Sequence, residues 1–362
     1  MSKLMRSVSG IRGVVGDSLT PQVLFSHTKA FLEITNAKKI VIGRDSRPTG
    51  EAIVQMVSGF CRLCGVDVID AGLATTPSVE ILVTELKADA GIIITASHNP
   101  LEWNALKFLN AKGLFLGPDD VKKLFALADE GKFSFPDYKE MGSYEFLDDA
   151  DSVHIQGTLA IPFVDVQAIR KAKFKVAIDA VNGAGSLIVP RLLEELGCDV
   201  VRVHCSPNGN FPRGAEPIPE HLGDLSKVVL ENNCAVGFAL DPDADRCAIV
   251  CGEGRAIGEE YTLAIATEEV LSKKPGNVCI NLSTSRMNED VAEKYGCKCS
   301  RAKVGEINVS LQMMEESCVI GGEGNGGVIL PALHYGRDSL VAVALVLSWM
   351  ARHNGGPEKF VK

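Results

Sequence analysis

The stretch FKVAIDAVNGAGSLIVPRLLEELGCDVVRVHC, residues 174–205, decides the fold class of this chain. It begins with a β-forming run that ends in a glycine-rich turn. Residues 186–197 then show the apolar spacing of a helix, and a second β-forming run follows at 198–205. A strand, a helix and a strand in this order are typical of an α/β unit. The chain is therefore predicted to have an α/β fold.

The same alternation occurs before and after this stretch. Residues 38–100 and residues 258–327 each alternate β-forming runs with helical segments. Three rounds of similar spacing predict three tandem, related α/β domains with mixed sheets. The loops near 134–160 and 251–258 carry turn-forming and acidic residues, which are typical of boundaries. We therefore expect domains at 1–150, 151–254 and 255–362.

The composition is that of a folded protein with an acidic balance. Of the 362 residues, 46% are hydrophobic and 23% are charged, which excludes wholesale disorder. The 46 acidic and 37 basic residues give a formal net charge of −9. Because nucleic-acid binding needs clustered Lys and Arg, no nucleic-acid partner is expected. A local basic pocket for a small phosphorylated ligand is still compatible with this charge.

Membrane and disulfide signals are weak. The most apolar helical run, Leu340–Met350, is well short of the roughly 20 residues that a membrane span needs, and Met1–Gly10 lacks the apolar core of a signal peptide. Eleven scattered cysteines, an odd number, favour reduced thiols in a cytoplasm. Cys61 and Cys64 form a CxxC without the second pair of ligands that zinc needs. We expect a cytoplasmic protein with no membrane partner, zinc site or redox role.

The loop TASHNP, residues 95–100, is the first candidate for chemistry. In open α/β sheets, ligands bind beyond the carboxyl ends of the strands, and this loop follows a predicted strand. Ser97 beside His98 suggests nucleophilic catalysis, for which a serine needs activation or covalent modification. The alternative is an Asn-Pro turn in which Ser97 is a capping residue. Composition alone favours the turn.

The second candidate is DPDADR, residues 241–246, where three carboxylates alternate after a buried-looking strand. Like charges so close repel one another unless a cation neutralises them. Ligation by oxygen alone suits Mg²⁺. The alternative is a solvated acidic turn, and the residues of an EF-hand are missing. Arg246 follows the acids and can contact a phosphate or pair with a carboxylate.

Two glycine-rich stretches invite a ligand-binding interpretation. Residues 321–327, GGEGNGG, let the backbone approach a ligand closely, and Glu323 and Asn325 can hydrogen-bond vicinal hydroxyls of a sugar. A flexible hairpin is an equally good interpretation. Residues 180–185, AVNGAG, match a dinucleotide fingerprint only in part, so we expect a tight strand-to-helix turn there.

Arginines occur in two further loops. In GRDSRPTG, residues 43–50, Arg44 lies between a predicted strand and a helix, where an anion can bind. The structural alternative is that Asp45 pairs with Arg44 or Arg47 to hold the turn. In SGIRG, near the start of the chain, Arg12 is flanked by glycines.

Together, SGIRG, GRDSRPTG, TASHNP, DPDADR and GEGNGG resemble the α-D-phosphohexomutase family in order and spacing, over nearly the whole chain. TASHNP followed by DPDADR is highly specific. The resemblance implies an intramolecular phosphotransferase that moves phosphate between O1 and O6 of a hexose through a bisphosphorylated sugar. It also implies Mg²⁺ as the cofactor, a hexose 1,6-bisphosphate as the activator and a sugar phosphate as the small-molecule partner.

The resemblance assigns roles to the residues of these loops. Ser97 is implied to carry a phosphate that holds Mg²⁺ together with three aspartates, which are Asp241, Asp243 and Asp245. Glu323 and Asn325 are implied to bind the sugar hydroxyls, and Arg44 is a further candidate for substrate binding.

The residues expected around the transferred phosphoryl group are basic. Lys107 matches the family lysine near the phosphoserine and is the candidate general base. Arg12 and Arg246 are expected to stabilise the transferring phosphoryl group, and His98 is expected to have a supporting role.

The sequence departs from the family pattern in two ways. Gly327 stands where many relatives have His, and Glu306 is an acid where the phosphomannomutase/phosphoglucomutase branch tends to have His. An acid there can pair with a sugar amine, which favours glucosamine phosphate over glucose or mannose phosphates. The family's fourth domain, with its Ser-Gly-Thr phosphate loop, has no counterpart here, so only three domains are expected. A phosphatase and a sugar-phosphate-binding protein are the alternative functions.

Overall fold

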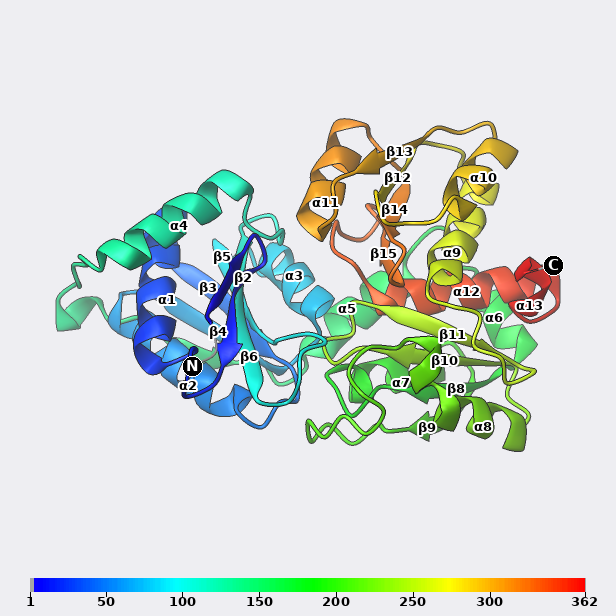
Figure 1. Ribbon diagram of the computed structural model, residues 1–362, viewed down its shortest axis with the longest axis horizontal. Helices are drawn as coiled ribbons and strands as arrows, with labels where there is room; N and C mark the ends of the chain where they lie inside the picture. The colour runs from blue at the N-terminus through cyan, green and yellow to red at the C-terminus, as the bar shows by residue number, and fades with distance from the viewer. Residues whose placement is uncertain (1–2, 362) are drawn as a thin grey trace. The chain divides into compact units, whose positions relative to one another are not determined.

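The computed structural model describes residues 3–361 and contains three β-sheets within that range (Figure 1). The chain divides into two compact units. We call them the N-terminal unit, which runs to His154 and includes Asn208–Asn210, and the C-terminal unit, which comprises Ile155–Pro207 and the residues from Phe211 onwards. Helices cover sheets of parallel and antiparallel strands in both units, so the predicted α/β fold with mixed sheets is confirmed.

The N-terminal unit holds one seven-stranded sheet with the order β1-β2-β6-β5-β3-β4-β7. β5 pairs in parallel with β3 and antiparallel with β6. The strands are β1 (Met5–Ser7), β2 (Gly10–Val14), β3 (Lys39–Arg44), β4 (Asp67–Leu73), β5 (Ala90–Ile94), β6 (Trp103–Asn110) and β7 (Tyr144–Phe146). The principal helices are α1 (Pro21–Thr35), α2 (Gly50–Leu63), α3 (Thr76–Glu85) and α4 (Pro118–Glu130).

Successive residues of the central strands face helices on opposite sides of this sheet. Ile40 and Ile92 are buried in a cluster with residues of α1, α2 and α4. On the other face, an added Cβ at Gly43 would lie 2.5 Å from Val79 of α3, so the missing side chain lets that helix pack closely. Because neighbouring residues of a strand point to opposite faces, a strand covered on both sides is apolar throughout. All five residues of β5 are accordingly buried.

The C-terminal unit holds two four-stranded sheets with the orders β11-β10-β8-β9 and β13-β12-β14-β15. In each sheet the outer pair, β10–β11 or β14–β15, is antiparallel and the other pairs are parallel. The strands of the first sheet are β8 (Lys175–Asp179), β9 (Asp199–Val203), β10 (Val236–Leu240) and β11 (Cys247–Cys251). Those of the second are β12 (Val278–Asn281), β13 (Cys299–Ala302), β14 (Ile320–Glu323) and β15 (Gly327–Ile329).

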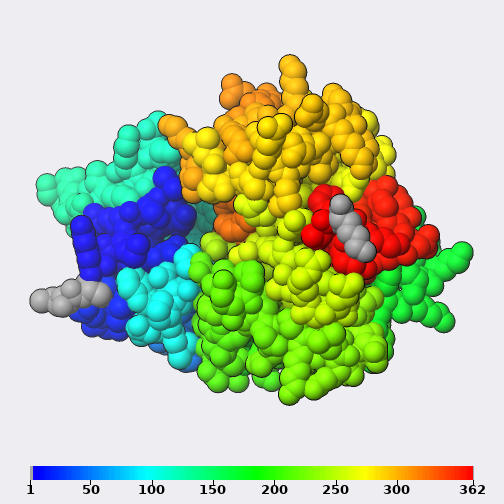
Figure 2. Space-filling model, turned by 45° about the vertical axis from the view of Figure 1, so that its right-hand side comes forward, coloured from blue at the N-terminus to red at the C-terminus, as the bar shows by residue number. Residues whose placement is uncertain are grey.

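Helix α12 (Ser339–His353) forms the centre of the C-terminal unit. Its residues from Ser339 to Met350 are buried, and they share one hydrophobic cluster with residues of both sheets. Figure 2 shows the C-terminal residues, in red, against the yellow-green residues of the same unit. The other helices are α5 (Ala150–Leu159), α6 (Val166–Ala172), α7 (Gly185–Glu195), α8 (Gly223–Glu231), α9 (Glu260–Lys273), α10 (Met287–Lys294), α11 (Glu306–Glu315) and α13 (Glu358–Val361).

The stretch near 134–160, predicted as a boundary loop, contains regular structure. β7 joins the edge of the N-terminal sheet beside β4, and Asp67 accepts hydrogen bonds at 2.7 Å from both the amide and the hydroxyl of Ser143. These long-range contacts stabilise a strand that composition alone does not indicate. The domain boundaries at 150/151 and 254/255 stay predictions. Within residues 3–361, no helix is long and apolar enough to cross a membrane.

Candidate active site

The Ser97 loop follows β5 at its carboxyl end, and the serine has a left-handed backbone with φ +49°. A non-glycine residue in this conformation costs about 1–2 kcal/mol, so other contacts must hold it. The Ser97 amide donates to Thr95 Oγ1 at 3.0 Å, and the Thr95 hydroxyl donates to Asp45 at 2.6 Å. Ser97 itself is 4% exposed. The loop is therefore a turn held by hydrogen bonds, and the role of Ser97 as a nucleophile stays a prediction.

Arg47 anchors this loop through its side chain. Its side chain is fully buried and pairs with Asp45 at 3.1 Å. Its guanidinium also donates to four backbone carbonyl oxygens, those of Ser97 at 2.7 Å, Asn99 at 2.6 Å, Pro100 at 2.5 Å and Trp103 at 3.1 Å. Of the two predicted partners for Asp45, the structure has Arg47. No local pattern in the sequence predicts that Arg47 also binds the serine loop.

The other predicted residues of the N-terminal unit lie near the same edge of the sheet. Arg44 ends β3 opposite Ile94 of β5 and donates to the Asp45 carbonyl at 3.1 Å. Arg12, on β2, donates to the Asn99 side chain at 2.7 Å. Lys107, on β6, pairs with Ile93 and is 4% exposed.

These positions bring the basic residues to the Ser97 loop. Arg12 faces Ala105 across the β2–β6 pair, so Arg12 and Lys107 lie on one face of the sheet. His98 is half-buried within the loop. The N-terminal unit thus gathers a serine, a histidine and several cations at one sheet edge.

The metal candidates lie in the C-terminal unit, directly after β10. Asp241, Asp243 and Asp245 are fully buried, and each offers a carboxylate oxygen within 4.8 Å of the others. Burial, together with the charges of Asp245 and Asp243, raises the pKa of Asp241 well above its usual value. Three buried carboxylates so close are unfavourable without a cation. The donor set, all oxygen and all acidic, therefore fits Mg²⁺.

The loop after β8 supports the metal loop. The Ala184 amide donates to the Pro242 carbonyl at 2.8 Å, and an added Cβ at Gly183 would lie 2.5 Å from that oxygen. Arg213 reaches the carboxyl ends of both neighbouring strands, pairing with Asp179 at 2.9 Å and donating to the Leu240 carbonyl at 2.5 Å. AVNGAG is therefore a tight turn, as predicted, and its glycine permits contact with the metal loop.

The sugar-loop candidates form the hairpin between β14 and β15. Glu323 Oε1 accepts from the Asn281 amide at 2.7 Å and from the Gly305 backbone at 3.0 Å. Burial by itself raises the pKa of Glu323, but Arg337, Asn281 and Gly305 outweigh it, and the pKa is lowered overall. Asn325 Oδ1 is buried and has no hydrogen-bond partner in the described part of the chain. The hairpin thus offers an ionised carboxylate and a buried amide oxygen as acceptors.

Arg337 joins these loops, and no sequence motif drew attention to it. Its guanidinium donates to Asp245 at 2.5 Å, to Glu323 at 2.7 Å and to Glu306 at 3.0 Å. Burial lowers the pKa of Arg337, but the carboxylates around it raise that pKa well above its usual value. Glu306, predicted to face a sugar amine, receives both the Arg337 side chain and its backbone amide, at 3.2 Å. Arg246, which the sequence did predict as a site residue, has its Nε 3.7 Å from Asp245 Oδ1.

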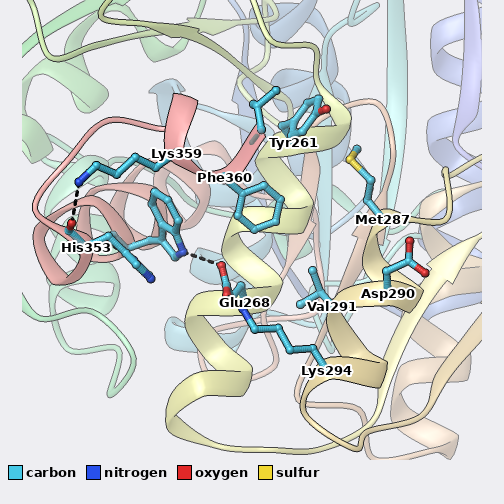
Figure 3. Close-up of a pocket in the computed structure, with 11 residues that line it drawn as sticks. Tyr261, Glu268, Met287, Asp290, Val291, Lys294, His353, Lys359 and Phe360 are labelled. Atoms are coloured by element: carbon cyan, nitrogen blue, oxygen red, sulfur yellow. Dashed lines mark hydrogen bonds and ion pairs between the residues drawn. The ribbon is translucent and has the colours of Figure 1, made fainter.

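Two other features do not involve the predicted site residues. Burial raises the pKa of the Cys61 and Cys64 thiols, which disfavours the reactive thiolate. A cavity of about 580 Å³ lies among α9, α10, α12 and α13 (Figure 3). There Trp349 donates to Glu268 at 2.8 Å, but none of the predicted site residues lines the cavity.

Comparison with known proteins identifies a family whose three domain models match this chain. Phosphoglucomutase/phosphomannomutase α/β/α domain I matches residues 3–135, domain II matches 153–254 and domain III matches 258–362. The chain belongs to the phosphoglucomutase/phosphomannomutase family. Members of this family of phosphohexomutases are isomerases that act as intramolecular phosphotransferases.

Individual family members resemble the whole chain. A protein named "Probable phosphoglucosamine mutase" from Methanopyrus kandleri is 35% identical, over 94% of this chain and 74% of the relative. A "Phosphoglucomutase/phosphomannomutase" from Thermococcus kodakarensis is also 35% identical, over 95% of this chain and 76% of the relative. The crystal structure of a phosphoglucomutase/phosphomannomutase family protein from Burkholderia thailandensis matches with a TM-score of 0.85 and 28% identity, covering 99% of this chain and 80% of that one. This chain thus spans about three quarters of the length of the two curated relatives.

Proposed function

We propose that this family member interconverts a hexose 1-phosphate and a hexose 6-phosphate, with Ser97 as the residue that carries the phosphoryl group. The observation that carries the proposal is the set of three fully buried aspartate carboxylates within 4.8 Å of one another at the end of β10. Asp241, Asp243 and Asp245 would hold Mg²⁺, and the family resemblance implies the Ser97 phosphate as a further ligand. The bound ion supplies charge neutralisation to the phosphoryl group.

Ser97 and basic residues from other segments perform the transfer. A hydroxyl of the sugar monophosphate attacks the phosphorus of phosphoserine 97, the bond to Ser97 Oγ breaks, and a bisphosphorylated sugar forms. Lys107 takes the proton of the attacking hydroxyl, and Arg12 and Arg246 stabilise the charge on the transferring oxygens. After the sugar turns over, its other phosphate returns to Ser97. A hexose 1,6-bisphosphate activates the enzyme because it phosphorylates the serine directly.

The sugar is held by acceptors of the C-terminal unit. The Glu323 carboxylate and the Asn325 amide oxygen accept hydrogen bonds from sugar hydroxyls, and Arg44 contributes to substrate binding from the N-terminal unit. We propose glucosamine phosphate as the substrate. The sequence suggested that Glu306 pairs with a sugar amine. The structure weakens that argument, because Arg337 already pairs with the Glu306 carboxylate at 3.0 Å. The relatives at 35% identity carry names for glucosamine as well as for glucose and mannose mutases.

A phosphorus NMR assay tests the reaction and the sugar together. The chain is mixed with Mg²⁺, a catalytic amount of glucose 1,6-bisphosphate and one of the 6-phosphates of glucosamine, glucose or mannose. The proposal predicts conversion to the 1-phosphate, fastest for glucosamine, and none for Ser97→Ala. Release of inorganic phosphate instead would indicate a phosphatase, and binding without conversion would indicate a sugar-phosphate-binding protein.

All eleven cysteines are free thiols, so we place the reaction in the cytoplasm.

A further inference from the structure

Arg337 contacts the metal loop and the sugar loop at the same time. Its Nη2 donates to Asp245 at 2.5 Å, and its Nη1 donates to Glu323 at 2.7 Å. Its Nε donates to Glu306, the first residue of α11, at 3.0 Å. Each nitrogen of the guanidinium therefore binds a carboxylate of a different segment. The planar fork of arginine allows this arrangement, and a lysine ammonium does not reproduce it.

Gly327 provides the space in which the Arg337 side chain lies. A Cβ added at Gly327 would stand 2.3 Å from Arg337 Cδ and 2.9 Å from its Cγ. Contacts under 3.0 Å require something to move. The guanidinium is held at three carboxylates, so the methylene chain cannot swing aside freely. Gly327, where many relatives are expected to have histidine, is thus matched to the arginine that crosses it.

The residues that follow Arg337 are also held in place, and the Asp338 amide donates to the Val328 carbonyl, just after the sugar loop, at 2.9 Å. The next residue, Asp338, caps α12 and accepts from the Leu340 amide at 2.7 Å. Ser339 donates to the Ala244 carbonyl, inside the metal loop, at 2.7 Å. On the sugar loop, the Gly326 carbonyl accepts from the Cys247 amide at 3.0 Å. A displacement of one loop is therefore transmitted to the guanidinium between them.

We propose that Arg337 is a positioning residue that couples Mg²⁺ binding at the aspartates to sugar-phosphate binding at Glu323 and Asn325; this rests on the proposed function. A cation at the three aspartates would relieve their mutual repulsion. Each aspartate offers one ligand oxygen, so the cation would also fix the orientation of the Asp245 carboxylate, whose Oδ2 accepts from Arg337. Arg337 in turn holds Glu323 in place for the sugar. Each ligand therefore tightens the binding of the other, and by linkage the factor is the same in both directions.

Isothermal titration calorimetry measures this coupling. Mg²⁺ is titrated into the full chain alone and in the presence of each of three sugar phosphates, the 6-phosphates of glucosamine, glucose and mannose. The ratio of the two Mg²⁺ dissociation constants is the coupling factor. For the wild-type chain we expect a factor between about 5 and 150, the usual range for coupled sites. For Arg337→Lys we expect a factor close to one.

Matched variants separate coupling from general damage. Arg352→Lys changes an arginine of α12 that pairs with the buried Glu269 at 2.9 Å, and it should keep the wild-type factor. Gly327→Ala displaces Arg337 without removing a charge, so it should also lower the factor, and it carries the test if Arg337→Lys does not fold. Gly223→Ala is its control, because an added Cβ there meets nothing within 4 Å. Thermal melts establish which variants are folded.

Two results would overturn the proposal. A folded Arg337→Lys or Gly327→Ala chain with the wild-type coupling factor would show that the coupling bypasses Arg337. A wild-type factor of one, or binding of none of the three sugar phosphates, would show that there is no coupling to transmit. If the wild-type chain binds both ligands with coupling but converts no sugar phosphate, the proposed function fails and the coupling role of Arg337 stands.

Discussion

The Arg47 guanidinium donates a hydrogen bond of 2.7 Å to the carbonyl oxygen of Ser97, the residue at the turn of the candidate phosphoryl-transfer loop. Ser97 has the left-handed backbone angle φ +49°. The bond holds the backbone of Ser97 and does not involve its hydroxyl. A buried cation thus stabilises the strained turn that contains Ser97.

Replacement of Arg47 should lower both activity and stability. Arg47→Met leaves the buried Asp45 without its ionic partner and several loop carbonyls without donors, so we expect a loss of about 3–5 kcal/mol in the free energy of unfolding. Arg47→Lys keeps the charge but loses the planar set of guanidinium donors. Turnover should therefore fall at least tenfold while the fold persists. Denaturant melts and the phosphorus NMR assay measure the two effects. Wild-type turnover in Arg47→Lys would show that the loop does not depend on this arginine.

Lys107 should be needed for turnover and not for folding. Lys107→Met keeps the length of the side chain and its packing near the Phe115 ring, which lies 5.6 Å from the ammonium. Loss of a general base typically costs about 10²–10⁴ in rate, so kcat should fall by that factor with little change in the melting temperature. Full turnover by the methionine variant would remove Lys107 from the mechanism.

The contribution of Asp241 to the stability of the metal-free chain should decrease as the pH rises. Burial and the neighbouring aspartates raise the folded-state pKa of Asp241 above its unfolded value of about 4. The folded state therefore holds this proton more tightly, and the stability that the proton contributes is lost as the pH rises from about 4 through the raised pKa. Mg²⁺ binds the ionised aspartates, so it should restore the lost stability and bind more tightly as the pH rises.

Melting temperatures measured across a pH series, with EDTA or with excess Mg²⁺, check this expectation. The two curves should separate as the pH rises. Asp243→Asn removes one carboxylate, so it should flatten the metal-free curve and abolish the effect of Mg²⁺. Superimposed curves for the wild-type chain would count against a cation site at the aspartates.

Gly183 should not tolerate a side chain. Its added Cβ would meet the Pro242 carbonyl oxygen at 2.5 Å, and the backbone of the metal loop would have to move. We expect Gly183→Ala to destabilise the chain by about 1–3 kcal/mol and to weaken Mg²⁺ binding. Gly223→Ala is again the control. Unchanged Mg²⁺ affinity in a folded Gly183→Ala chain would show that the metal loop does not rest on this turn.

Local sequence patterns predicted the parts of the fold that depend on neighbours in the chain. The β-forming runs before TASHNP and DPDADR became β5 and β10, and both loops lie at the carboxyl ends of those strands, as the α/β pattern requires. The third loop, at Glu323, lies in a hairpin, which is one of the two interpretations that its glycine-rich sequence allows. The predicted roles of these residues await the experiments above.

Residues that act across the chain were not predictable in this way. Arg337 is 92 positions from Asp245 and 31 from Glu306, so no spacing rule connects them. The sequence predicts Arg47 only as a partner for Asp45, because its contacts with Ser97 and Asn99 span 50 and 52 positions. The strand β7 depends on pairing with β4, more than 70 residues earlier. Each of these features is decided by tertiary contact.

The central claim, that Ser97 carries the phosphoryl group, is tested most directly by intact mass and phosphosite mapping. The chain is incubated with Mg²⁺ and glucose 1,6-bisphosphate, beside Ser97→Ala and Asp243→Ala. The account predicts one added phosphoryl group, located on Ser97, in the wild-type chain and none in either variant. An unmodified wild-type chain, or a phosphoryl group on another residue, would contradict it.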